Sequence, residues 1–124
     1  MDGRLDDREQ PVLDLSLVGV RESLTVLIDT GFEGELIAYQ NQLTALGLQP
    51  VYRDLERVRL ADGTIAVTLV TTIPVIWHGE LRSVAVNVIT QEASGEARAL
   101  LGCQLLRDSM LDVDFPNATV RITR

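Results

Sequence analysis

Residues 26–32 read Val-Leu-Ile-Asp-Thr-Gly-Phe, and the interpretation of the whole chain depends on this stretch. The first three residues are apolar, as in a buried strand, and Asp29-Thr30-Gly31 follows where that strand is expected to end. Gly34 comes shortly after, so the backbone has the freedom that a tight turn needs. The pattern predicts a carboxylate on a turn directly after a strand. Taken alone, it also fits an aspartate that only caps its own turn.

Apolar and polar residues alternate on both sides of this stretch, and such alternation predicts strands. The expected strands are residues 12–18, 24–28, 36–38, 51–60, 65–70, 73–76, 81–89, 99–102, 111–115 and 118–122. Asp62-Gly63 lies between two alternating runs, which is the strongest short-range signal for a hairpin. Short helices are expected at 41–47 and 103–109. The predicted fold class is therefore all-β with one or two short helices.

The length and composition predict one globular domain. The chain has 124 residues, of which 46% are hydrophobic and only 4% aromatic, so Val, Leu, Ile and Ala must build the core. Residues 1–10 carry six charged side chains and are expected to form a mobile N-terminal tail. The domain is then expected to span residues 11–124.

The charge balance excludes several classes of partner. The formal net charge is −7, whereas nucleic-acid binding needs Lys and Arg to displace counterions from phosphates. No apolar run approaches the roughly 20 residues of a membrane span. Cys103 is the single cysteine, so no internal disulfide can form, which fits a reducing, cytoplasmic location. We therefore expect no nucleic-acid or membrane partner.

Other reactive side chains have ordinary interpretations. His78 is the single histidine and is expected to face solvent in a turn. With one histidine and one cysteine there is no spaced cluster for a transition metal. We expect no metal and no organic cofactor. Cys103 is expected to be a small buried apolar residue beside Gly102. Glu33 and Glu35 are expected to face water.

Three segments in a fixed order resemble the retropepsin-like aspartic proteases. They are Leu27-Ile28-Asp29-Thr30-Gly31-Phe32, Leu60-Ala61-Asp62-Gly63-Thr64, and the run from Leu100-Leu101-Gly102 to Phe115. The similarity covers residues 11–115 and is strongest to small bacterial and archaeal members whose motif ends in Phe. It implies a closed acid-protease barrel half that is completed as a homodimer.

The resemblance also implies roles for particular residues. Aspartic proteolysis needs two carboxylates that share one proton, and this chain has a single Asp-Thr-Gly. Asp29 from each of two subunits would form the catalytic pair, Thr30 would bond across the dimer axis, and Gly31 would donate its N–H to the carboxylate. The implied substrate-binding residues are Phe32 and the flap residues Ala61, Asp62, Gly63 and Thr64. The implied substrate is a peptide or an unfolded protein.

The sequence departs from retroviral members in three places, one of which is a flap hairpin that is poorer in glycine. Phe32 stands where those enzymes have Ala, and Cys103-Gln104 replaces an Arg and its polar partner. Two alternatives therefore stay open beside the protease. One is a module that keeps the fold and binds peptides without cleaving them, and the other is a monomeric partner protein. The closing strands 111–115 and 118–122 are further candidates for the dimer sheet.

Overall fold

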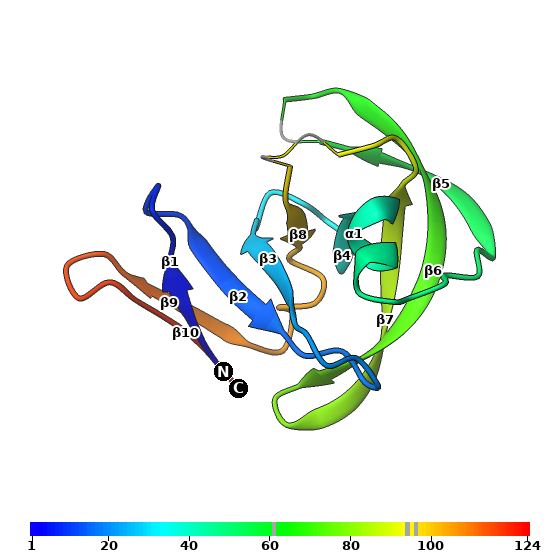
Figure 1. Ribbon diagram of the computed structural model, residues 1–124. Coiled ribbons are helices and arrows are strands. Elements are labelled where there is room, and N and C mark those ends of the chain that lie inside the picture. The colour runs from blue at the N-terminus through cyan, green and yellow to red at the C-terminus, as the bar shows by residue number, and fades with distance from the viewer. Residues whose placement is uncertain (61, 94, 96) are drawn as a thin grey trace.

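The structure is a computed structural model that describes residues 1–60, 62–93, 95 and 97–124. Within these residues the chain forms ten strands and one short helix (Figure 1). The elements are β1 Asp2–Leu5, β2 Pro11–Leu15, β3 Leu24–Ile28, β4 Leu36–Tyr39, α1 Gln40–Ala45, β5 Asp54–Arg59, β6 Ile65–Trp77, β7 Glu80–Ile89, β8 Ala99–Leu101, β9 Met110–Asp114 and β10 Thr119–Thr123. The prediction of an all-β chain is confirmed. None of the described helices is long and apolar enough to cross a membrane.

All described strands belong to one sheet, in the order β5-β6-β7-β4-β8-β3-β2-β1-β10-β9. Figure 1 shows that β6 bends strongly along its length, as a long twisted strand does when its sheet curls around a core. The core side chains are almost entirely aliphatic, with Trp77 as the largest fully buried residue. The sheet thus folds back on itself around one large apolar core, with a second, smaller apolar cluster beside it.

Local turn chemistry explains the hairpins. The β6–β7 hairpin has a two-residue turn, His78-Gly79, in which both residues have positive φ, 52° and 76°. This backbone twist matches that of the flanking strands, and glycine adopts it without steric cost. The expected hairpin at 77–80 is therefore present, with Trp77 buried at its base.

The second expected helix is wrong. Residues 103–109 form successive turns, whereas α1 occupies most of the expected 41–47 segment. A helix of that length gains few backbone bonds against a costly nucleation step. In this segment Leu105 and Leu106 are buried in the core, so tertiary packing holds the turns without a regular helix.

The expected mobile tail at residues 1–10 is also wrong. Asp2–Leu5 forms β1, which pairs antiparallel with β10 on one side and with β2 on the other. Gly3 makes this pairing close, since a Cβ there would lie 2.3 Å from the Val12 carbonyl oxygen. Met1 and Leu5 pack against the core, while the charged side chains between them point outward. A half-buried strand in the middle of a sheet needs only these few apolar contacts.

Asp6 fixes the loop after β1 and makes its stability depend on pH. Its Oδ1 accepts the N–H groups of Arg8 and Gln10, each at 2.9 Å, and its Oδ2 lies 2.8 Å from Arg98 Nη2. The Gln10 and Arg8 N–H groups and the Arg98 guanidinium hold the pKa of Asp6 below the ordinary value of 3.8. A carboxyl whose pKa is lowered on folding stabilises the protein above its unfolded pKa. That contribution is lost as the pH falls through the folded pKa.

We therefore expect Asp6→Asn to lower the urea midpoint at neutral pH and to differ less from wild type in strong acid. Urea unfolding across a pH series measures this difference. Asp7→Asn is the matched control, because Asp7 is an exposed carboxylate in the same loop. A deficit of Asp6→Asn that stayed constant at every pH would contradict the role of ionised Asp6.

Candidate active site

Asp29 lies where two parallel strands end. Ile28 and Leu101 are neighbours in the parallel pair of β3 and β8, and the Asp29 N–H donates to the Leu101 carbonyl at 2.9 Å. The strand ladder thus continues one residue into the loop and fixes the backbone of Asp29. The side chain is only partly buried in the single chain.

The carboxylate of Asp29 is oriented by its own loop. The Gly31 N–H donates to Asp29 Oδ1 at 3.0 Å, and the Phe32 N–H donates to the Asp29 carbonyl at 3.1 Å. A Cβ at position 31 would lie 3.2 Å from Asp29 Oδ1, which is a tight contact, so glycine allows the close approach. Thr30, between them, is exposed on the surface of the chain.

A second backbone segment, residues 102–104, supports the active-site loop, residues 29–35. Its N–H groups donate to three carbonyls of the loop: Gly102 to Glu35 at 2.9 Å, Cys103 to Phe32 at 2.8 Å, and Gln104 to Gly34 at 3.2 Å. The approach is so close that a Cβ at Gly102 would lie 2.2 Å from the Gly34 oxygen. The Asp-Thr-Gly turn and the Leu-Leu-Gly segment therefore form one packed unit.

Phe32 is buried in a small apolar cluster of its own. It packs with Ile37 and Val58, and the partly buried Leu60 and Leu100 lie against them. Its ring also covers Gly34, where a Cβ would lie 2.5 Å from the ring. The larger residue in place of Ala thus fills the space between the active-site loop and strand β5.

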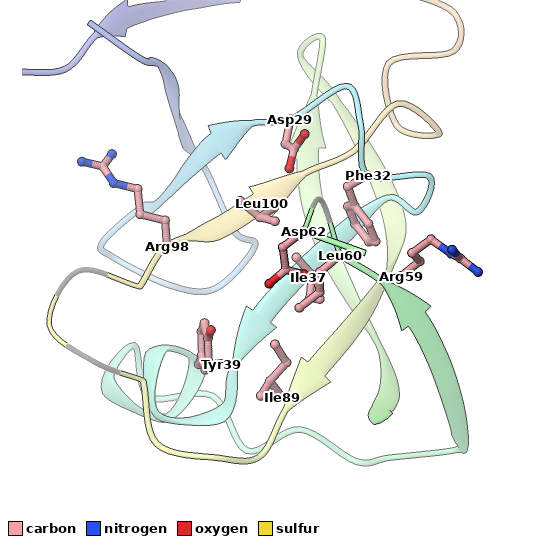
Figure 2. A pocket seen from close by; sticks show the side chains of 10 residues that line it. All are labelled: Asp29, Phe32, Ile37, Tyr39, Arg59, Leu60, Asp62, Ile89, Arg98 and Leu100. Carbon is pink, nitrogen blue, oxygen red and sulfur yellow. The ribbon is translucent and has the colours of Figure 1, made fainter. Parts of the chain in front are cut away.

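A cavity of about 310 Å³ lies beside Asp29 (Figure 2). It is lined by Asp29, Phe32, Ile37, Tyr39, Arg59, Leu60, Asp62, Ile89, Arg98 and Leu100. In Figure 2 the side chains of Arg59 and Arg98 point away from it, while Ile37, Ile89 and Leu100 face one another. The cavity is therefore mainly apolar, with the Asp29 carboxylate on one side and Asp62 on another.

The flap is the hairpin turn between β5 and β6, residues 60–64, and it borders this cavity. The Leu60 N–H donates to the Thr64 carbonyl at 2.8 Å, and Gly63 has φ of 85°. Asp62 Oδ1 accepts the Thr64 hydroxyl at 2.6 Å and the Thr64 N–H at 2.9 Å, and these bonds lower the pKa of Asp62. Of the expected flap residues, Asp62 lines the cavity, whereas Ala61 lies outside the described residues.

A second hollow of about 460 Å³ also borders Phe32. It shares Phe32, Arg59 and Leu60 with the first cavity and also touches Gly31 and Gly63. The active-site loop and the flap thus border both hollows.

Comparison with known proteins gives matches at the level of structure. No protein-family model matches the chain, and no curated protein matches it. The structure is similar to a retropepsin-like aspartic protease from Rickettsia conorii, with a TM-score of 0.66 and 14% identity over 99% of this chain and 88% of that one. It is also similar to the EIAV protease in complex with the inhibitor HBY-793, with a TM-score of 0.64 and 16% identity over 83% of this chain and 90% of that one.

The chain has a retropepsin-like fold. The resemblance expected from the three sequence segments is therefore confirmed for the fold, including the barrel half with one short helix. In this retropepsin-like fold Asp29, Phe32 and Asp62 line the cavity, while Gly31 donates its N–H to the Asp29 carboxylate and lines the second hollow.

Three expectations about other side chains are wrong. Cys103 is exposed, because its backbone turns toward the active-site loop and leaves Sγ outside, 3.8 Å from the Glu33 carbonyl. Glu35 is bonded to β7 and does not simply face water. His78 is half-buried in its turn, with Nε2 2.7 Å from Ser109 Oγ.

Sequence reasoning missed most residues that line the cavity. Ile37 and Tyr39 alternate along β4, Ile37 is opposite Leu100 of β8, and Tyr39 is opposite Ile89 of β7. Opposite residues in a sheet share a face, so these four point the same way. The short apolar run of β4 is visible in the sequence, but the pairing of β4 with β7 and β8 is not.

Proposed function

We propose that this protein is an aspartic endopeptidase that works as a homodimer and hydrolyses peptide bonds in extended or unfolded segments. The observation that carries the proposal is the placement of Asp29. It stands at the end of two parallel strands, accepts the Gly31 N–H, and faces an apolar cavity that the flap borders. The similarity to two aspartic proteases supports the same reading.

The proposed chemistry needs two copies of Asp29. Two carboxylates about 3 Å apart cannot both ionise easily, so the pair holds one proton. The ionised carboxylate takes a proton from water, which attacks the peptide carbonyl, while the protonated partner donates to the carbonyl oxygen. Collapse of the tetrahedral intermediate then breaks the C–N bond as the amine leaving group gains a proton. No metal or organic cofactor takes part.

The loop and the flap have separate tasks in this scheme. The Gly31 N–H fixes one carboxylate oxygen, so the other is left for the water and the partner's carboxylate. The flap, with Asp62, Gly63 and Thr64, would close over the substrate and exclude water. Phe32 would support one wall of the binding groove. Backbone bonds from an extended substrate to the flap would give affinity, and the two hollows would set side-chain preference.

Strand β9 is the proposed main contact between subunits. In the described sheet β10 is paired on both sides, by β1 and β9, whereas β9 is the last strand and leaves one edge open. Met110, its first residue, and Phe115, the residue directly after it, are exposed at 69% and 57%. A symmetric β9–β9 contact would join two sheets, and exposed Thr30 would then bond across the axis.

Association of the subunits is expected to strengthen in mild acid. Each chain has a formal net charge of −7 at neutral pH, so a dimer has −14, and its two subunits repel each other. Exposed Asp112 lies in the middle of β9 and would face its own copy. Sedimentation velocity between neutral and mildly acidic pH measures the strength of association. The double variant Met110→Lys/Phe115→Lys is expected to weaken the dimer at every pH. Weaker association in mild acid would argue against the charge effect.

The direct test of the proposed function is cleavage of an unfolded, alkylated protein between mildly acidic and neutral pH. The concentration must be high enough to populate the dimer. A peptide with a secondary alcohol in place of the scissile carbonyl should inhibit the reaction, because it resembles the tetrahedral intermediate. A dimer that binds this peptide and never cleaves the substrate would favour the binding module. A stable monomer would favour the partner-protein alternative.

A cytoplasmic location is part of the proposal. Cys103 is an exposed free thiol next to the active-site loop, and exposed thiols persist where the compartment is reducing. Under oxidising conditions a disulfide between the Cys103 residues of two copies would interfere with the proposed homodimer.

A further inference from the structure

Glu35 closes the active-site loop against strand β7. Its carboxylate is 14% exposed, with Oε2 3.0 Å from Arg82 Nη2 and Oε1 3.1 Å from the Ala85 backbone nitrogen, which donates to it. The carbonyl of the same residue accepts the Gly102 N–H at 2.9 Å. Glu35 thus binds strand β7 through its side chain and residue 102 through its carbonyl. These two segments lie on either side of the point where the loop re-enters the sheet.

The register of the sheet explains why a carboxylate is needed here. Strands β4 and β7 are parallel, and their pairing begins at Leu36 and Val86. Ala85 comes one residue before Val86, the first paired residue of β7. Its N–H therefore has no β4 carbonyl that could accept a strand-to-strand hydrogen bond. The Glu35 side chain supplies the acceptor and extends the ladder by one bond. Because the acceptor is ionised and Arg82 neutralises it, these bonds are stronger than neutral ones.

The other end of the loop is held by the bond from the Asp29 N–H to the Leu101 carbonyl, and the Cys103 and Gln104 N–H groups hold the loop between its two ends. Between these two ends the chain makes the turn in which Gly31 orients the Asp29 carboxylate. Without the Glu35 side chain the loop would keep its backbone bonds to residues 102–104 but lose both of its side-chain bonds to β7. The end at Glu35 would then be held less tightly, and the Asp29 carboxylate would be placed less precisely. A displacement of about 1 Å can cost about 100-fold in rate when reacting groups must meet in a fixed geometry.

We propose that Glu35, held by Arg82 and the Ala85 N–H, is a positioning residue for Asp29. This rests on the proposed function, since the geometry that it protects is the meeting of two Asp29 carboxylates. Glu35 does not touch the cavity beside Asp29 and takes no part in proton transfer. It acts through the backbone of the active-site loop.

The test compares Glu35→Ala, Glu35→Gln and the control Glu80→Gln. Glu35→Ala removes both bonds, whereas Glu35→Gln keeps an acceptor for the Ala85 N–H. Glu80 forms an exposed ion pair with Arg124 at 3.3 Å, so its variant makes the same chemical change on the surface. We expect Glu35→Ala to lower kcat by about 10- to 100-fold with KM changed less than about threefold. Glu35→Gln should lose less, and Glu80→Gln should match wild type.

A second readout does not depend on activity. Amide hydrogen exchange followed by NMR reports how often the Asp29 and Gly31 N–H bonds open. We expect both amides to exchange faster in Glu35→Ala, and by less in Glu35→Gln. If Glu35→Ala does not fold, Glu35→Gln is compared with Glu80→Gln instead. The positioning role then predicts a lower kcat and faster exchange at Asp29 and Gly31 in Glu35→Gln alone.

The outcomes separate this inference from the proposed function. Unchanged kcat and unchanged Asp29 and Gly31 exchange in a folded Glu35 variant would overturn the positioning role, even if the melting temperature fell. Absence of cleavage by the wild-type dimer would overturn the protease proposal instead. The exchange measurement would then still show whether Glu35 holds the loop.

Discussion

Asp29→Asn is expected to reduce peptide hydrolysis by at least about 10³-fold, because removal of a general acid–base group costs on the order of 10² to 10⁴. The substitution keeps the size of the side chain and an oxygen that can accept the Gly31 N–H. An amide cannot share or release the proton, however, and in a homodimer both members of the pair change together. The measurement is the initial rate of cleavage of an unfolded protein at a concentration where sedimentation shows a dimer.

The control for this variant is Asp7→Asn. It changes the same chemical group in an exposed loop and is expected to cleave at the wild-type rate. Asp29→Asn that remained a dimer and still cleaved at the wild-type rate would rule out Asp29 as the catalytic carboxylate. If neither wild type nor Asp29→Asn cleaved, and both bound peptide equally, the protein would be a binding module that has kept the fold.

Gly102→Ala is expected to destabilise the protein by about 3 kcal/mol or more, at the upper end of the cost of overpacking. The added Cβ would lie 2.2 Å from the Gly34 oxygen, and 2.6 Å from both the Phe32 oxygen and Phe32 Cδ2. Two of these contacts are with backbone atoms that are themselves hydrogen-bonded to residues 103 and 104. The loop cannot yield without breaking its own support.

Urea unfolding measures the loss, and Gly95→Ala is the matched control. A Cβ at Gly95 would meet no atom within 4 Å, so that variant should be about as stable as wild type. Gly102→Ala with wild-type stability would mean that the active-site loop can move away from residues 102–104 at little cost. The close packing of these two segments would then not be what holds Asp29 in place.

The strands and the retropepsin-like fold could be predicted because the relevant signals are local. Alternation locates β3, β6 and β7, and Asp62-Gly63 sits between two alternating runs as a hairpin turn requires. The position of Asp29 after β3 follows from the apolar run that precedes it. These features depend on neighbours along the chain, and the sequence contains them directly.

The errors arise where contacts between distant residues decide the structure. β1 is a strand because β2 and β10 supply partners on both sides, although its own composition is highly charged. Cys103 is exposed because its N–H is bonded to the Phe32 carbonyl. Glu35 is held by β7 because the β4 register leaves the Ala85 N–H without a ladder acceptor. None of these can be inferred from the residues next to them.

The support of the active-site loop by residues 101–104 has a consequence for synthesis of the protein. A chain leaves the ribosome from its N-terminus, at roughly 5–20 residues per second, so Asp29 emerges several seconds before the segment that fixes it. Until then the Asp29 N–H has no Leu101 carbonyl, and β1 has no β10 beside it. A nascent chain therefore carries Asp29 before the loop around it can take its final structure, and the site can form only after residues 101–104 have emerged. Contacts of such long sequence separation slow folding. Under the proposed function, this delay would limit cleavage of neighbouring proteins during synthesis.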